Sequence, residues 1–181
     1  MLRTLFAILF ASVLATASAA AAPAQAALDA YRGGDYAGAA SVAESDPAAA
    51  SLAFAARARI AEAITAPGGF SIEALDRARI DAERAIERDP SLVEGHLQAA
   101  VALGFRARVI GIMQARSEEL PERAHAHLER ALAIDPSNPW ALASLGAWHL
   151  EIVTRAGPIL ASLTYGASES EGLDRKSTRL N

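Results

Sequence analysis

Cysteine is absent from this chain of 181 residues, lysine occurs once, and only 6% of the residues are aromatic. Without cysteine there is no disulfide framework and no lipobox thiol to which a lipid could be attached. Patterns typical of strands are scarce as well, whereas 52% of the residues are hydrophobic and many of these are alanine. Alanine has the highest helix propensity, so this composition favours an all-α protein with a packed core.

Motifs that carry chemistry are missing too. The chain has no Gly-x-Ser-x-Gly elbow, no phosphate-binding glycine loop ahead of a lysine, and no GxGxxG after a strand. Its four histidines are His96, His125, His127 and His149, and none has strong metal-ligand spacing, since helix residues two apart point to different faces. We therefore expect no metal, no cofactor and no catalysis, unless a catalytic set lies beyond Leu173.

Basic charge is also in short supply. The chain has 21 Asp and Glu against 17 Lys and Arg, and its arginines alternate with acidic residues in the segment from Asp76 to Arg84. No basic stripe is present that would bind nucleic acid. We interpret these alternating charges as a solvated helix face with ion pairs one turn apart.

Long hydrophobic runs are lacking except at the N-terminus, where Arg3 precedes a ten-residue apolar run from Leu5 to Leu14. Ala-x-Ala sites follow, ending at Ala19 and Ala26. This order is typical of a secretory signal peptide, and the run is shorter than the roughly 20 residues that cross a bilayer. We predict a signal peptide in residues 1–26, cleavage after Ala19 or Ala26, a periplasmic or secreted protein, and no stable membrane anchor after cleavage. An uncleaved anchor is the alternative.

Two segments of the chain repeat each other: Ala78-x3-Ala82-x2-Ala85-x4-Pro90 and Ala124-x3-Leu128-x2-Ala131-x4-Pro136. Each places small or apolar residues at helical spacing and closes on Asp-Pro. Small side chains let a neighbouring helix approach closely, and proline ends a helix because it restricts the residue before it and lacks a backbone donor. Repeated helix pairs cannot bury their apolar faces alone, so the pattern predicts units that stack into a solenoid.

These segments resemble the tetratricopeptide (TPR) repeat family. Leu142-x2-Leu145-Gly146 follows Pro136, where that family has two large residues and a small one on a first helix. The resemblance implies antiparallel helix pairs in a right-handed solenoid over residues 27–173. The repeats are degenerate, because Pro90 and Pro136 are 46 positions apart and a unit spans about 34. An ordinary alanine-rich helical bundle is the alternative.

The extra residues of the long unit fall around Gly104 to Ser117. Arg106 and Arg108 stand there among apolar residues. This segment is either a lengthened first helix that projects over a ligand groove, or a buried helix whose arginines reach the solvent with their charged ends.

Leu145-Gly146-Ala147-Trp148, with Glu151 three positions on, resembles bacterial relatives of the regulator of microtubule dynamics proteins. For an exported protein this likeness implies shared TPR-like architecture rather than microtubule binding. We expect Trp148 to pack in the core and Trp140 to lie partly exposed near a helix start, where tryptophan often dominates a contact. Arg106, Arg108, Trp140 and His149 are the candidate partner-binding residues.

The C-terminal octapeptide, Asp174 to Asn181, resembles the translation of a common sequencing-adapter oligonucleotide, and it contains the single lysine, Lys176. We expect residues 174–181 to be a non-native tail and the native protein to be truncated near Leu173. Pro158 is expected to interrupt the helix that begins near Trp140.

Taken together, the sequence predicts an exported TPR-type scaffold that binds a protein or peptide in its groove and catalyses nothing. The alternative is a solute-binding or transport-accessory protein that holds a small anionic ligand near Arg106 or Arg108.

Overall fold

A computed structural model describes residues 22–177, and the side chains of residues 22–174. This part of the chain is all helical. Its helices are α1 (Gln25–Arg32), α2 (Tyr36–Glu44), α3 (Ala49–Thr65), α4 (Ile72–Arg88), α5 (Val93–Ile110), α6 (Ile112–Ser117), α7 (Leu120–Ile134), α8 (Pro139–Ala156), α9 (Pro158–Leu160), the short π-helix η1 (Ala161–Tyr165) and α10 (Glu169–Ser177). The prediction of an all-α protein is confirmed.

The predicted signal peptide and the predicted non-native tail each overlap the described residues by only a few positions. Most of the predicted signal peptide, including the Ala19 site, lies outside the described residues, and Ala26 lies in the first turn of α1. At the other end, α10 continues without a break across the predicted boundary at Asp174. Among the described residues, no helix combines the length and the apolar character that a membrane crossing requires.

The Asp-Pro pairs end helices as predicted. Asp89 and Asp135 are the C-terminal caps of α4 and α7, and both have extended backbones. Asn138 caps the start of α8, where its side chain accepts hydrogen bonds from the backbone N–H groups of Trp140 and Ala141 at 3.2 and 3.0 Å. Helix boundaries here are set locally, by proline and by capping side chains.

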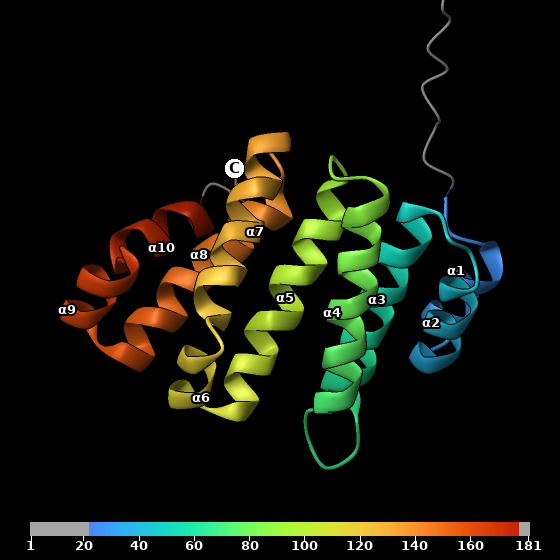
Figure 1. Cartoon of the computed structure of the whole chain (residues 1–181), viewed down its shortest axis with the longest axis horizontal. Helices are drawn as coiled ribbons and strands as arrows, with labels where there is room; N and C mark the ends of the chain where they lie inside the picture. Colours follow the sequence, from blue (N-terminus) through green and yellow to red (C-terminus); the bar gives the residue numbers. More distant parts are fainter. Residues whose placement is uncertain (1–21, 178–181) are drawn as a thin grey trace, which may run out of the picture.

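Helices that are neighbours in the chain are also neighbours in space, in the order shown in Figure 1. The pairs are α1 with α2, α3 with α4, α5 with α7, and α8 with α10. Each pair packs on the next through α2 and α3, α4 and α5, and α7 and α8. The first helices of successive pairs also contact one another, α3 with α5 and α5 with α8.

Alanine dominates the contacts between the helices. Ala56 of α3, Ala82 of α4 and Ala99 of α5 form one fully buried cluster, and Ala78 and Ala85 lie in similar clusters one turn away on either side. Of the residues predicted to pack the repeats, Ala78, Ala82, Ala85, Ala124, Leu128, Ala131, Leu145 and Gly146 are buried, Leu142 is half-buried, and Pro90 and Pro136 are exposed in connections.

The residues around Gly104 to Ser117 complete α5 and form α6. Gly111, with φ of 86°, lies between the 18-residue α5 and the six-residue α6. A positive φ is unfavourable for residues with a Cβ atom, so glycine fits this position. This segment thus adds a short helix before α7 and leaves the pairing of α5 with α7 intact.

The alanine contacts generate a stability prediction. Replacement of Ala82 by leucine would add three carbon atoms at a fully buried site. We therefore expect the free energy of unfolding to fall by about 1–3 kcal/mol. Ala133 is exposed on α7, and Ala133→Leu, the matched control, is expected to change it by less than about 0.5 kcal/mol. Urea unfolding followed by circular dichroism measures both. Equal effects of the two substitutions would contradict the prediction.

Candidate functional site

The four candidate partner-binding residues do not gather at one place. Arg106 turns toward α4 and α6, where its Nε lies 2.7 Å from Asp76 Oδ1 and its guanidinium also pairs with Glu118. Burial acts to lower the pKa of Arg106, but Glu118 and Asp76 together raise it above its ordinary value. Arg106 is therefore a cation already shared by two carboxylates.

Trp140 and His149 lie on α8 in different surroundings. Trp140 is 58% exposed at the start of the helix. His149 is only 3% exposed, and its Nδ1 accepts a hydrogen bond from the backbone N–H of Ser168 at 3.3 Å. The burial of His149 places it in the contact between α8 and the segment that leads into α10, away from the molecular surface.

Arg108 reaches across to α8. Its Nη2 and Nε lie 2.8 and 3.1 Å from the two carboxylate oxygens of Glu151, and its guanidinium carbon stands 5.4 Å from the centre of the Phe105 ring. Arg155, one turn along α8, pairs with the same carboxylate. Burial acts to raise the pKa of Glu151, but the two arginines outweigh it, so the pKa lies below its ordinary value.

A largely apolar hollow lies beside this charge cluster. It has a volume of about 290 Å³ and is bounded by α5, α7, α8 and the residues next to them. We call it the α5–α8 hollow. Gly104 and Ala107 line it from α5, Ala124 from α7, and Trp148 from α8. Arg108, Glu151 and Arg155 also line it, and their side chains are 43%, 30% and 39% exposed, so they stand on its solvent side.

Trp148 is held firmly in the wall of the α5–α8 hollow. Its Nε1 donates to the carbonyl oxygen of Pro121 at 3.0 Å, and its ring lies 4.4 Å from the ring of His125, centre to centre. The expected packing role of Trp148 is present, because the indole contacts Leu120 and Ala124 of α7 through a shared cluster. The indole also faces the hollow, a role that the sequence analysis did not anticipate.

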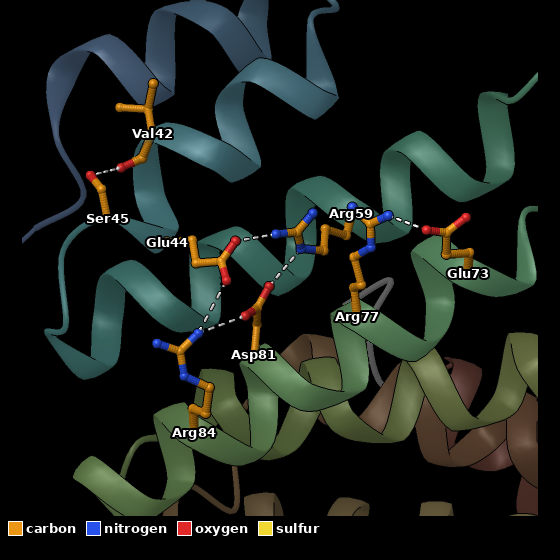
Figure 2. Close-up of polar contacts among 8 residues, drawn as sticks. All are labelled: Val42, Glu44, Ser45, Arg59, Glu73, Arg77, Asp81 and Arg84. Carbon is orange, nitrogen blue, oxygen red and sulfur yellow. Dashed lines mark hydrogen bonds and ion pairs between the residues drawn. The ribbon is translucent and has the colours of Figure 1, made fainter.

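The charged residues from Asp76 to Arg84 are at least partly exposed, as expected, with the exception of Asp81. Asp81 is 2% exposed and Arg59 of α3 is 6% exposed, and Arg59 Nε lies 2.7 Å from Asp81 Oδ2. Figure 2 shows that Glu44 of α2 and Arg84 of α4 complete a ring around them. The expectation was wrong at Asp81, because α3 and α2 cover that side of α4.

The ring balances two arginines against two carboxylates. Arg84 Nη1 lies 3.3 Å from Glu44 Oε1 and 3.2 Å from Asp81 Oδ1. Burial raises the pKa of Asp81 above its ordinary value, although Arg59 and Arg84 act against this shift. Since every member contacts an opposite charge, the ring is a structural link between α2, α3 and α4 and leaves no charged group aimed at a ligand.

Two histidines meet between α5 and α7. His96 is 6% exposed, its Nε2 lies 3.1 Å from the carbonyl oxygen of Pro90, and its Nδ1 lies 3.3 Å from Nδ1 of His127. A carbonyl only accepts, so Nε2 of His96 carries a hydrogen, and when the ring is neutral its Nδ1 can accept from His127. Burial, and then His96, lower the pKa of His127.

Metal-ligating side chains do not cluster in the part of the chain that the structure describes: no group of three or more His, Cys, Asp or Glu there is arranged to hold a metal ion. His125 and His127 point to different faces of α7, as the sequence predicted, one toward Trp148 and the other toward His96.

Comparison with known proteins adds no family assignment. No protein-family model matches the chain, and no curated protein matches it significantly. The geometry of the described residues is therefore the basis for any functional proposal.

The α5–α8 hollow is the candidate functional site. Sequence reasoning selected Arg108 for it and missed Gly104, Glu151 and Arg155. One signal was available, because Trp148, Glu151 and Arg155 are spaced by three and four positions and so share one face of a helix. The apolar walls come from several helices, α5, α6, α7 and α8 among them, and no spacing within one helix reveals them.

Removal of one partner from the buried ring tests its structural role. Arg59→Met leaves Asp81 buried without its closest cation, and we expect a loss of about 3–5 kcal/mol in the free energy of unfolding. In the double variant Arg59→Met/Asp81→Leu, most of this loss is expected to return, since no buried charge is left alone. Figure 2 also shows the exposed pair of Arg77 and Glu73, and Arg77→Met is expected to have little effect. If Arg59→Met has only a small effect on the free energy of unfolding in urea, the ring does not have the proposed structural role.

The histidine pair predicts a pH dependence of stability. The folded state holds His127 at a pKa below the ordinary value of 6.5, so near that pH the unfolded chain binds more protons than the folded one. The contribution of His127 is complete above pH 6.5 and is lost as the pH falls through 6.5 toward the folded pKa. Urea unfolding from pH 7.5 to 5.5 should show this decline. His127→Gln, which keeps a donor but does not titrate, should flatten it, and an unchanged slope would rule out the assignment.

Proposed function

We propose that this protein is an exported scaffold of stacked helix pairs, similar in architecture to TPR proteins, that binds a protein or peptide without catalysing a reaction. Two features support the architecture: helices pair in sequence order, and first helices of successive pairs contact each other. Neighbour-only packing of this kind is characteristic of solenoids, which usually present extended binding surfaces. The N-terminal pattern of Arg3 and an apolar run supports export.

The observation that carries the binding proposal is an apolar edge. Most of the exposed large apolar residues in the described part of the chain lie in or beside three connections, between α3 and α4, α5 and α7, and α8 and α10. Antiparallel pairing puts each connection where the first helix of its pair ends. Figure 1 shows the first two at the lower edge of the stack and α9, in the third, at its left end. The residues of this apolar edge are Ile64, Phe70, Ile72, Ile112, Met113, Ile159, Leu160 and Leu163.

The exposure of this edge is unusually high for apolar side chains. Met113 and Leu163 are each 81% exposed and Ile159 is 77% exposed. Large apolar side chains exposed to this degree often mark a protein contact when they gather on one side of a soluble protein. The edge has few charges in its connections, whereas the outer surface of α4 carries alternating arginines and acids. Apolar contact, rather than charge pairing, is therefore the proposed source of affinity.

Site-specific photo-crosslinking tests the proposal. A photoreactive phenylalanine analogue at Met113 or at Leu163, in the protein expressed in its own cells, is expected to form a discrete crosslinked product with another protein. The same analogue at Glu87, an exposed position of α4 away from the apolar edge, is the matched control. The triple variant Met113→Ser/Ile159→Ser/Leu163→Ser should remove a crosslink formed from Ile72. Identical products from the edge positions and from Glu87 would count against a binding edge.

A further inference from the structure

Beyond protein binding, the α5–α8 hollow has the features of a small-molecule site. We propose that it binds an apolar molecule of about ten carbon atoms that bears one anionic group, with the apolar part against Gly104 and Trp148 and the anion beside Arg155. This site does not depend on the apolar edge. Three features of the hollow support this proposal: the size of the space, the residue that keeps it open, and the charge on its solvent side.

The space suits a molecule of that size. Its volume is about 290 Å³, and its walls are mostly apolar side chains of α5, α7 and α8, with Ile112 and Ala115 of α6 and Tyr165 of η1. An apolar cavity of about 150 Å³ holds a benzene ring, so by proportion this hollow holds about ten to twelve carbon atoms. Such a ligand would remove the apolar walls from water, which favours binding by about 25 cal/mol for each Å² covered.

Glycine at position 104 keeps the space open. Gly104 lies within α5 and lines the hollow, and a methyl group in place of its hydrogen would meet no neighbouring helix within 4 Å. Gly95 on the same helix differs, because a Cβ there would come within 3.1 Å of Ile86. Packing therefore explains Gly95 but not Gly104, which lowers helix propensity by about 1 kcal/mol relative to alanine. Open space in the hollow is the feature that glycine provides at this position.

The charge on the solvent side selects an anion. Arg108 and Arg155 both pair with the single carboxylate of Glu151, so these three groups together carry one excess positive charge. Arg108 contacts Glu151 through two nitrogens, whereas only Nε of Arg155 contacts it. The planar guanidinium of Arg155 thus has donors left for a ligand carboxylate. A neutral molecule of the same shape would gain the apolar contact but not this pairing.

Decanoate and its neutral counterpart 1-decanol are suitable probes. The chain has two tryptophans, so Trp140→Phe leaves Trp148, in the wall of the hollow, as the only indole fluorophore. In this background we expect saturable changes of Trp148 emission on titration with decanoate, and about fivefold weaker binding of decanol, the difference that one partly exposed ion pair typically makes. Arg155→Gln should weaken decanoate binding by about the same factor and leave decanol binding unchanged.

Gly104 provides a pair of matched variants that do not threaten folding. Both Gly104→Ala and Gly104→Leu introduce better helix formers, so both are expected to unfold at or above the temperature of the parent protein. Only the leucine side chain fills the hollow, since its four carbons occupy about a third of the space, and it should weaken decanoate binding by roughly tenfold or more. Gly104→Ala should bind decanoate nearly as the parent does.

Three results would overturn the proposal. Absence of a saturable response to decanoate would show that the hollow is not a ligand site, and equal binding by the Gly104→Leu and Gly104→Ala variants would place the ligand elsewhere. Equal affinity for decanoate and decanol, with no effect of Arg155→Gln, would show that the site does not recognise an anionic group.

Discussion

Close approach of the helices through alanine is the constraint on which the structure depends. Ala82 contacts α3 and α5 at once through the cluster with Ala56 and Ala99, so three helices meet where none has a side chain beyond Cβ. A larger side chain cannot be accommodated at such a point without displacing a helix, because protein interiors are densely packed. Figure 1 shows the successive helix pairs that such contacts bring together, and leucines replace most of these alanines between α5, α7 and α8.

A core built from alanine buries little apolar area per residue, so other interactions must specify how the helices lie. Between α2, α3 and α4 that role falls to the ring of Arg59, Asp81, Glu44 and Arg84. A buried ion pair adds little net stability over apolar packing, but its loss is costly once one partner remains. Separation of α3 from α4 would leave buried charges of the ring without partners and is therefore unfavourable. The alanines allow the two helices to pack closely enough for the ring to form.

The sequence predicted those features that depend on neighbouring residues. Asp89 and Asp135 end helices because proline restricts the residue directly before it. The cap at the start of α8 is equally local, since the Asn138 side chain binds backbone groups two and three positions on. The sequence could not predict the pairing of Arg59 with Asp81, which are 22 positions apart on different helices. The α5–α8 hollow could not be predicted for a related reason, because its walls come from several helices that are distant in the sequence. Of its charged residues, the sequence analysis selected only Arg108.

Larger residues fill more of the space beyond α5. Between α3, α4 and α5 the clusters combine alanines with a few larger residues such as Leu52, Ile60 and Leu75. Beyond α5 the chain passes through Gly111 and α6 before α7 begins at Leu120. Trp148 fills part of the space beside α7, anchored by Pro121 and His125. An indole fixed at one wall and a glycine at the other leave a volume that neither helix closes. Ile112 and Ala115 of α6 also line the α5–α8 hollow, so the helix inserted between α5 and α7 contributes to its walls.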